Sequence, residues 1–167
     1  MPTTYEPIAT TTLSTTAASV EFTSISGNYT DLIVVVTADL DTTGDLRFRI
    51  NSDTGSNYSF TGLYGDGTSA GSFRASNNTT GLATYYGQVT TTLGNSVQIL
   101  QFLNYSNSTT YKTIIARANN AGGGVDAIVN LWRSTSAITS LTFAKGSSFT
   151  GTWQSGSTFT LYGILSA

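Results

Sequence analysis

Short runs of alternating apolar and polar residues dominate the chain, and clusters of Gly, Asn, Asp and Ser separate them. In one clear example, Leu46, Phe48 and Ile50 fall on one face of an extended strand and two arginines fall on the other. Such a period of two, rich in β-branched and aromatic residues, predicts half-buried β-strands. The 3.6-residue period of an amphipathic helix is absent from the sequence. We predict strands over residues 8–13, 19–23, 31–39, 46–50, 58–64, 83–89, 97–103, 111–118, 127–133, 141–145 and 158–165.

The spacing of these strands predicts the architecture. They recur about every 10–15 residues with turn residues between them, as in a sandwich or barrel. Residues 31–39 are the most apolar, and we expect them to be central and covered on both sides. The fold class is therefore all-β, an antiparallel two-sheet sandwich of the jelly-roll type. We expect a single domain over residues 14–167, and residues 1–13 to be either an extended arm that lies on a neighbour or a plain edge strand.

Composition excludes several classes of protein. The chain has no His and no Cys, which removes disulfides, thiolate nucleophiles, His-based triads and the usual zinc sites. Its net charge is −2 and charged residues make up 10% of it, so a clustered basic patch for nucleic acid is lacking. No apolar run approaches the ~20 residues of a membrane helix. We predict a protein that is not an enzyme, has no catalytic residues and no cofactor, and binds neither nucleic acid nor membrane.

Sparse charge also bears on assembly. Charged side chains on strand edges usually prevent unwanted pairing between molecules. This chain has few of them, so we expect its strand edges to be hidden in a homo-oligomer.

Three carboxylates lie on one short loop, at Asp39, Asp41 and Asp45. Oxygen ligands in this number could wrap a Ca²⁺ ion, although an EF-hand loop starting at Asp39 would need Glu where Ile50 stands. The alternative is a solvated β-turn, and we assign no metal site beyond this weak candidate. The loop over residues 51–58 is interpreted as a hydrogen-bonded connection, with Asx turns and a positive φ at Gly55, rather than a ligand loop.

Two tryptophans receive different interpretations. Trp132 lies in a predicted strand and is expected in the core. Trp153 lies in a predicted turn between Gly151 and Gly156, and its exposed ring could stack on a glycan.

Four segments, in order along nearly the whole chain, resemble small β-sandwich virion proteins of tailed bacteriophages, including phages of marine bacteria and cyanobacteria. The segments are residues 5–13 (YEPIATTTL), 19–32 (SVEFTSI to YTDL), 46–58 (LRFRINSDTGSNY) and 156–164 (GSTFTLYGI). The third is the most specific. The family tends to carry Asn-Gly-Asp where this chain has Asn51, Ser52 and Asp53.

The resemblance implies a structural protein of the virion. We expect a non-enzymatic capsid decoration (cement) protein on the head surface, a trimer favoured, which binds the major capsid protein or other virion proteins and bridges coat subunits. The N-terminal residues Pro2, Tyr5, Pro7 and Ile8 are the expected partner contacts. A tail protein is the alternative, as part of a fibre, tailspike or baseplate that touches host glycans. A free carbohydrate-binding module is a third interpretation.

Overall fold

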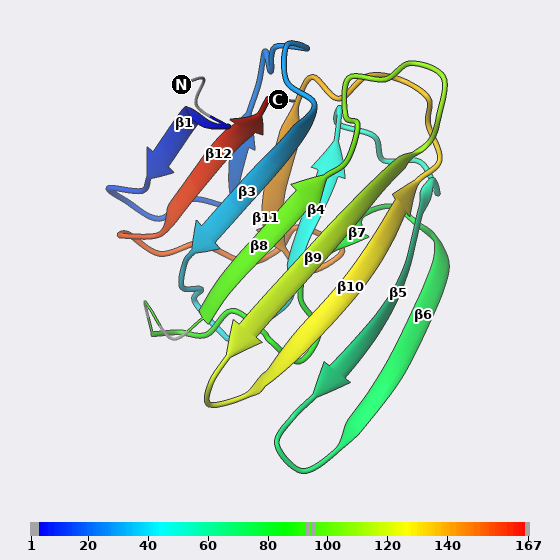
Figure 1. Cartoon of the computed structure of the whole chain (residues 1–167). Coiled ribbons are helices and arrows are strands. Elements are labelled where there is room, and N and C mark those ends of the chain that lie inside the picture. The colour runs from blue at the N-terminus through cyan, green and yellow to red at the C-terminus, as the bar shows by residue number, and fades with distance from the viewer. Residues whose placement is uncertain (1–3, 93, 95, 166–167) are drawn as a thin grey trace.

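The computed structural model of the chain describes residues 4–92, 94 and 96–165. Within these residues all regular structure is β-strand, arranged as two antiparallel sheets of eight and four strands (Figure 1). The large sheet has the order β1 (Tyr5–Thr12), β12 (Thr158–Ile164), β3 (Asp31–Thr37), β8 (Ser96–Phe102), β9 (Lys112–Asn120), β10 (Gly124–Trp132), β5 (Tyr58–Gly65) and β6 (Ala70–Asn78). The small sheet has the order β2 (Ser19–Phe22), β11 (Leu141–Lys145), β4 (Leu46–Ile50) and β7 (Gly81–Leu82).

The strand order confirms the jelly roll. From β1 to β4, each strand lies in the other sheet from the one before it. The chain also crosses between the sheets from β7 to β8, from β10 to β11 and from β11 to β12. This gives β1-β12-β3-β8 facing β2-β11-β4-β7, the eight-stranded arrangement of a jelly roll. The described residues add the hairpins β5–β6 and β9–β10, which extend the large sheet beyond β8 (Figure 1). We call β9, β10, β5 and β6 the added strands.

The apolar core lies between the two sheets. Phe48 of the small sheet meets Phe102 of the large sheet edge to face, with ring centroids 5.6 Å apart. On β3, the side chains of Leu32, Val34 and Val36 are fully buried. Its outward residues are only half-buried, so the prediction that residues 31–39 are covered on both sides is wrong. The large sheet leaves its outer face open.

The predicted strand over residues 83–89 is also wrong. This segment is irregular apart from an isolated backbone bridge between Val89 and Gly44, and a side chain of β10 holds its middle, residues 85–87. The Asp126 carboxylate accepts hydrogen bonds from the backbone N–H groups of Tyr85, Tyr86 and Gly87, at 2.6, 3.0 and 2.7 Å. Four residues further along β10, the Asn130 side-chain amide accepts a hydrogen bond from the Leu82 N–H at 2.8 Å and donates one to the Leu82 carbonyl at 2.9 Å.

The sequence prediction also missed β6. Its residues (AGSFRASNN) are mostly those of turns, but β6 is the outermost strand of the large sheet. An edge strand pairs on one side and is half exposed, so it does not need a strongly apolar sequence.

At the other edge of the large sheet, β1 pairs with β12. Residues 5–12 therefore form the edge strand that was one of the two alternatives for the N-terminal segment. A bulge between Pro7 and Ala9 interrupts the pairing. Proline and bulges both blunt an edge against further pairing.

Candidate functional site

The outer face of the large sheet carries the exposed large aliphatic side chains of the described residues. Leu63, Val125 and Val129 are 63%, 56% and 46% exposed, and Ile115 and Ile99 are just over a third exposed. They come from β5, β10, β9 and β8, which are neighbours in the sheet. We call these five residues the outer patch. Contiguous exposed apolar surface of this kind usually marks an interaction site.

Register brings the outer patch together. Val129 stands opposite Ile115 on β9, and Ala127 stands opposite Leu63 on β5. A hollow of about 380 Å³ opens between these side chains, and Gly62 also lines it. The outer patch is therefore a surface with both protruding and recessed parts.

Strand β10 explains why the apolar residues face outward. Its inward positions include Asp126 and Asn130, which are 5% and 1% exposed. Its outward positions include Val125 and Val129. Because Asp126 and Asn130 hold the neighbouring segment by hydrogen bonds, they lie inward together with Ile128 and Trp132, and the aliphatic side chains of the other face are left exposed.

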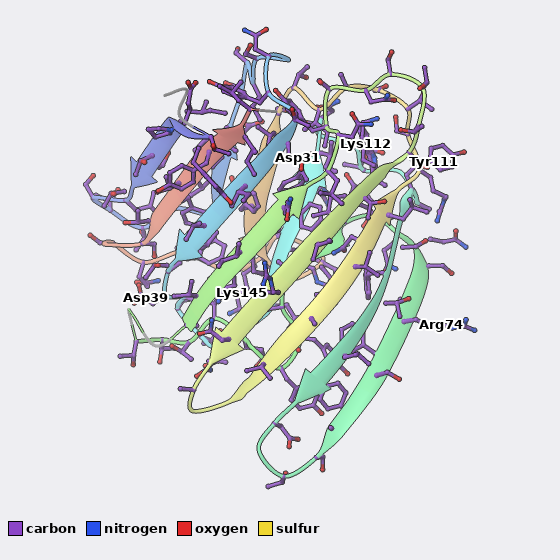
Figure 2. The ribbon with its side chains drawn as sticks, viewed as in Figure 1. Asp31, Asp39, Arg74, Tyr111, Lys112 and Lys145 are labelled. Atoms are coloured by element: carbon purple, nitrogen blue, oxygen red, sulfur yellow. The ribbon has the colours of Figure 1, made fainter. Side chains whose placement is uncertain are left out.

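Few charges lie on this face. Among the described residues, Arg117 stands next to Ile99 and Ala127 in register, inside the outer patch. Asp31 and Arg74 lie toward the two sides of the sheet (Figure 2). The Asp31 carboxylate accepts hydrogen bonds from the Asn104 backbone at 2.7 Å and the Gln101 amide at 3.3 Å. The middle of the face therefore carries one cation and no acid.

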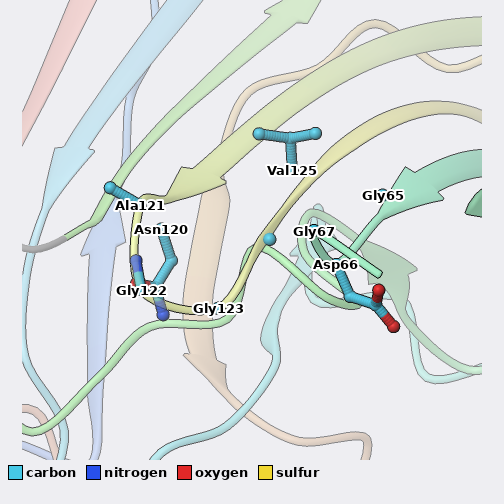
Figure 3. A pocket seen from close by; sticks show the side chains of 9 residues that line it. Gly65, Asp66, Gly67, Asn120, Ala121, Gly122, Gly123 and Val125 are labelled. Atoms are coloured by element: carbon cyan, nitrogen blue, oxygen red, sulfur yellow. The ribbon is translucent and has the colours of Figure 1, made fainter. Parts of the chain in front are cut away.

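A second, glycine-rich pocket lies between the β5–β6 turn and the β9–β10 turn (Figure 3). It has a volume of about 380 Å³. The Asp66 carboxylate accepts hydrogen bonds from the backbone of Thr68 and Ser69, which hold the pKa of Asp66 below its ordinary value. The Asn120 amide bonds to the backbone of Gly122 and Gln88. These polar groups fix their own turns.

The buried cation Lys112 joins two loops (Figure 2). Its Nζ donates hydrogen bonds to the carbonyl oxygens of Thr110 and Thr135, at 2.8 and 3.1 Å. Burial lowers the pKa of Lys112. Since both partners are backbone carbonyls, this side chain acts as a structural connector.

The structure does not bring the predicted calcium ligands together. Asp41 pairs with Lys145 at 2.9 Å, and this hydrogen bond holds the pKa of Asp41 below its ordinary value. Asp45 pairs with Arg47 at 3.2 Å, while Asp39 is contacted by a serine hydroxyl. No group of three His, Cys, Asp or Glu side chains in the described part of the chain is placed to hold a metal ion.

The loop over residues 51–58 is a network of local hydrogen bonds. Asp53 accepts from the Trp132 indole at 2.6 Å and from the Asn57 amide at 2.9 Å. Burial opposes its ionisation, but these hydrogen bonds outweigh burial and hold the pKa of Asp53 below its ordinary value. The predicted positive φ at Gly55 is wrong, because the left-handed residues are Asn51 and Ser52, at φ 50° and 56°.

Trp132 lies in the core as predicted, at 2% exposure. The prediction for Trp153 is wrong, because its side chain is fully buried. Backbone bridges to Ala17 and Leu40 hold the segment against the body of the fold, and the indole ring packs edge to face on Phe159 at 5.1 Å. The Trp153 ring therefore has no free face for a glycan.

A different group of aromatic residues reaches the surface. Tyr64 and Tyr86 stack at 4.0 Å, and Phe73 contacts Tyr85 at 4.3 Å. Tyr85 is 40% exposed. Both tyrosines fall within the strand predicted over residues 83–89, because nothing local shows that Asp126 holds them in a loop.

Of the predicted partner contacts, Tyr5, Pro7 and Ile8 lie on β1. Pro2 lies outside the described residues. Tyr5 is 56% exposed and Pro7 is also exposed, while Ile8 is half-buried and packs against the core. Tyr5 and Pro7 are thus the accessible members of this set.

The sequence matches no protein-family model and no curated protein. Within the described residues, no helix is long and apolar enough to span a membrane. The fold is an all-β jelly-roll sandwich, and the likeness to bacteriophage virion proteins stays a prediction from the four sequence segments.

Proposed function

We propose that this protein is a non-enzymatic structural protein of a bacteriophage virion, and specifically a capsid decoration (cement) protein on the head surface. Its work is to bury surface against the major capsid protein and against other copies of itself. Binding to the assembled shell and not to dissociated subunits stabilises the shell by mass action. The sequence analysis favours a trimer for this role.

The observation that carries this proposal is the outer patch. A strand that turns Val125 and Val129 outward and Asp126 inward presents a surface suited to burial in an assembly. The buried acid and the buried lysine are both engaged by backbone groups, in the manner of structural residues. The resemblance of the four sequence segments supplies the virion context.

Copy number in purified virus particles tests the proposal. Quantitative mass spectrometry against the major coat protein is expected to find hundreds of copies per particle. A few to a few dozen copies would move the protein to the tail. Its absence from particles would overturn a virion role and leave a free binding module.

A second test measures the stabilisation itself. Recombinant protein added to particles that lack it is expected to raise their melting temperature, with saturation at the copy number found in native particles. Particles that bind no protein, or melt unchanged when saturated, would contradict a cement role.

The tail alternative has its own supporting observation, the exposed ring of Tyr85 beside Tyr64 and Phe73. Apolar faces of sugars stack on such rings. Binding of the isolated protein to host cells or to a glycan panel, lost in Tyr85→Ala and kept in Tyr111→Ala, would favour a tail protein. Tyr111 is a suitable control because it is also exposed and lies on a different loop.

A further inference from the structure

We propose that the four residues of the outer patch on the added strands, Leu63, Ile115, Val125 and Val129, are covered by the same face of a second copy of this chain, in a face-to-face pair with two-fold symmetry. This inference rests on the proposed function, because both treat the open face of the large sheet as an interface. It deepens that function by naming the partner and by predicting an even-numbered assembly in place of a trimer.

The first argument is the pattern of side-chain size across β10 and β5. Val125 stands opposite Gly65, and the small Ala127 stands opposite Leu63. Val129 stands opposite Thr61. In the first two pairs a protruding side chain on one strand is beside a smaller one on the other, and in the third the two side chains are of similar size.

This pattern suits a two-fold axis that runs along the strands between β10 and β5, in the plane of the interface. It places β10 of one copy over β5 of the other. Leu63 then meets Ala127 of the second copy, and Val125 meets its Gly65. Because the symmetry repeats each contact, one surface supplies both the protruding and the recessed parts.

The shape of the sheet suits the same partner. Two sheets of the same twist pack face to face with their strands within about 30° of each other. A second copy brings a sheet with the twist of the first. An axis inclined by about 15° to the strands gives this crossing angle and keeps β10 over β5 near the axis.

Charge is compatible with this axis. Arg117 lies on β9, one strand away from β10 and on the side opposite β5. With strands about 4.8 Å apart, the two copies of Arg117 stand roughly 14 Å from each other across the axis. They avoid direct repulsion, because each faces Ser72 on β6 of the other copy. Arg74, two residues further along β6, faces Ile115 of the other copy.

The area is sufficient for a reversible pair. The four added strands span about 19 Å in width and roughly 28 Å in length, or about 500 Å² for each copy. A total near 1,000 Å² is at the lower limit of specific interfaces. We therefore expect a dimer with a dissociation constant in the micromolar range. A high local concentration of copies on a particle would favour its formation.

Sedimentation of the full chain from about 1 to 500 μM tests the pair. The expected result is a monomer–dimer equilibrium that Leu63→Lys weakens at least about 100-fold, because it buries two unpaired ammonium groups. The matched control Ser19→Lys, on an exposed position of the small sheet, is expected to keep the dimer. Circular dichroism checks that both variants fold.

A size exchange tests the geometry. Ala127→Leu crowds the recess and Leu63→Ala removes the protrusion, so each single variant is expected to weaken the dimer about 10-fold. The double variant exchanges the two roles and is expected to recover most of that loss. Because the two residues are also neighbours within one chain, the deciding result is that an equimolar mixture of the two single variants forms dimers more readily than either variant alone. Equal association of the mixture and the single variants would overturn the contact across the interface.

The outcomes separate this inference from the proposed function. A monomer at all concentrations, a trimer, or a dimer untouched by Leu63→Lys would overturn the pair, even with hundreds of copies on the virus. A dimer that depends on Leu63, in a protein absent from purified particles, would support the pair and overturn the virion role.

Discussion

Strands β3 and β10 belong to the same sheet, but β3 buries only apolar side chains, whereas β10 buries two polar side chains among its apolar ones. β3 turns Val34 and its apolar neighbours into the core. β10 turns Asp126 and Asn130 inward, and exposes Val125 and Val129. The two strands differ in what lies across from them.

Across from β3 is the small sheet, whose backbone groups are hydrogen-bonded to one another (Figure 1). Only apolar packing is needed there. Across from β10 are the short strand β7 and the irregular segment that follows it, in which the N–H groups of residues 85–87 bond to a side chain and not to a neighbouring strand. Buried backbone groups must be paired, so β10 supplies side chains that accept and donate hydrogen bonds. The covering layer decides which residues a strand must point inward.

The largest effect should come from removing the inward acid of β10. Asp126→Ala leaves three backbone N–H groups without an acceptor in a buried site. Loss of such a charge-assisted set is expected to lower the free energy of unfolding by about 3–5 kcal/mol. Urea denaturation of the purified protein measures it.

Asp66→Ala is the matched control for this prediction. That carboxylate also accepts two backbone N–H groups, but it does so in a turn open to solvent. We expect a much smaller loss than in Asp126→Ala, because water replaces the carboxylate. Equal losses in the two variants would contradict the structural importance of the inward polar face.

The next effect concerns Tyr58 on β5, whose side chain also accepts a hydrogen bond from the backbone of the facing layer. Its buried hydroxyl accepts a hydrogen bond from the Ile50 N–H at 2.9 Å, and burial raises the pKa of Tyr58. The folded state thus keeps this proton to a higher pH than the unfolded state. The free energy of unfolding is expected to fall above pH ~10, by roughly 1.4 kcal/mol per pH unit from this group.

Tyr58→Phe isolates that contribution. At pH 7 the variant should be less stable by about 1 kcal/mol, because the Ile50 N–H loses its acceptor. Above pH ~10 its stability should fall less steeply than that of the parent chain. Parallel pH profiles for the two proteins, measured by denaturant unfolding, would show that Tyr58 does not carry this dependence.

The same contrast explains how much of the fold the sequence could predict. The alternation within residues 46–50 and 141–145 placed both strands with their observed bounds, because strands face strands in that part of the core. Residues 83–89 have a similar local pattern. Their partner, Asp126, is some 40 residues away along the chain, and no local pattern reveals it.

The outer patch was missed for a related reason. In residues 124–132 (GVDAIVNLW), one face carries Val125 and Val129 and the other carries Asp126 and Asn130. The period of two separates these faces but does not tell which one is buried. Patterning alone would turn the valines inward. The spacing of two polar residues four positions apart was the available signal that the other face needs hydrogen-bond partners.

The smallest effect lies at the junction between the two kinds of strand. The turn after β4 leads from the jelly roll into the added strands, and its hydrogen bond joins the Asp53 N–H to the Ile50 carbonyl at 2.9 Å. Both central residues have positive φ, so the turn belongs to the kind that favours Asn followed by Gly. Ser52→Gly is therefore expected to raise the free energy of unfolding by about 0.5–1 kcal/mol, whereas Ser52→Ala leaves it nearly unchanged. Denaturant unfolding of the three proteins measures both, and a loss of stability in Ser52→Gly would contradict the strain assigned to this residue.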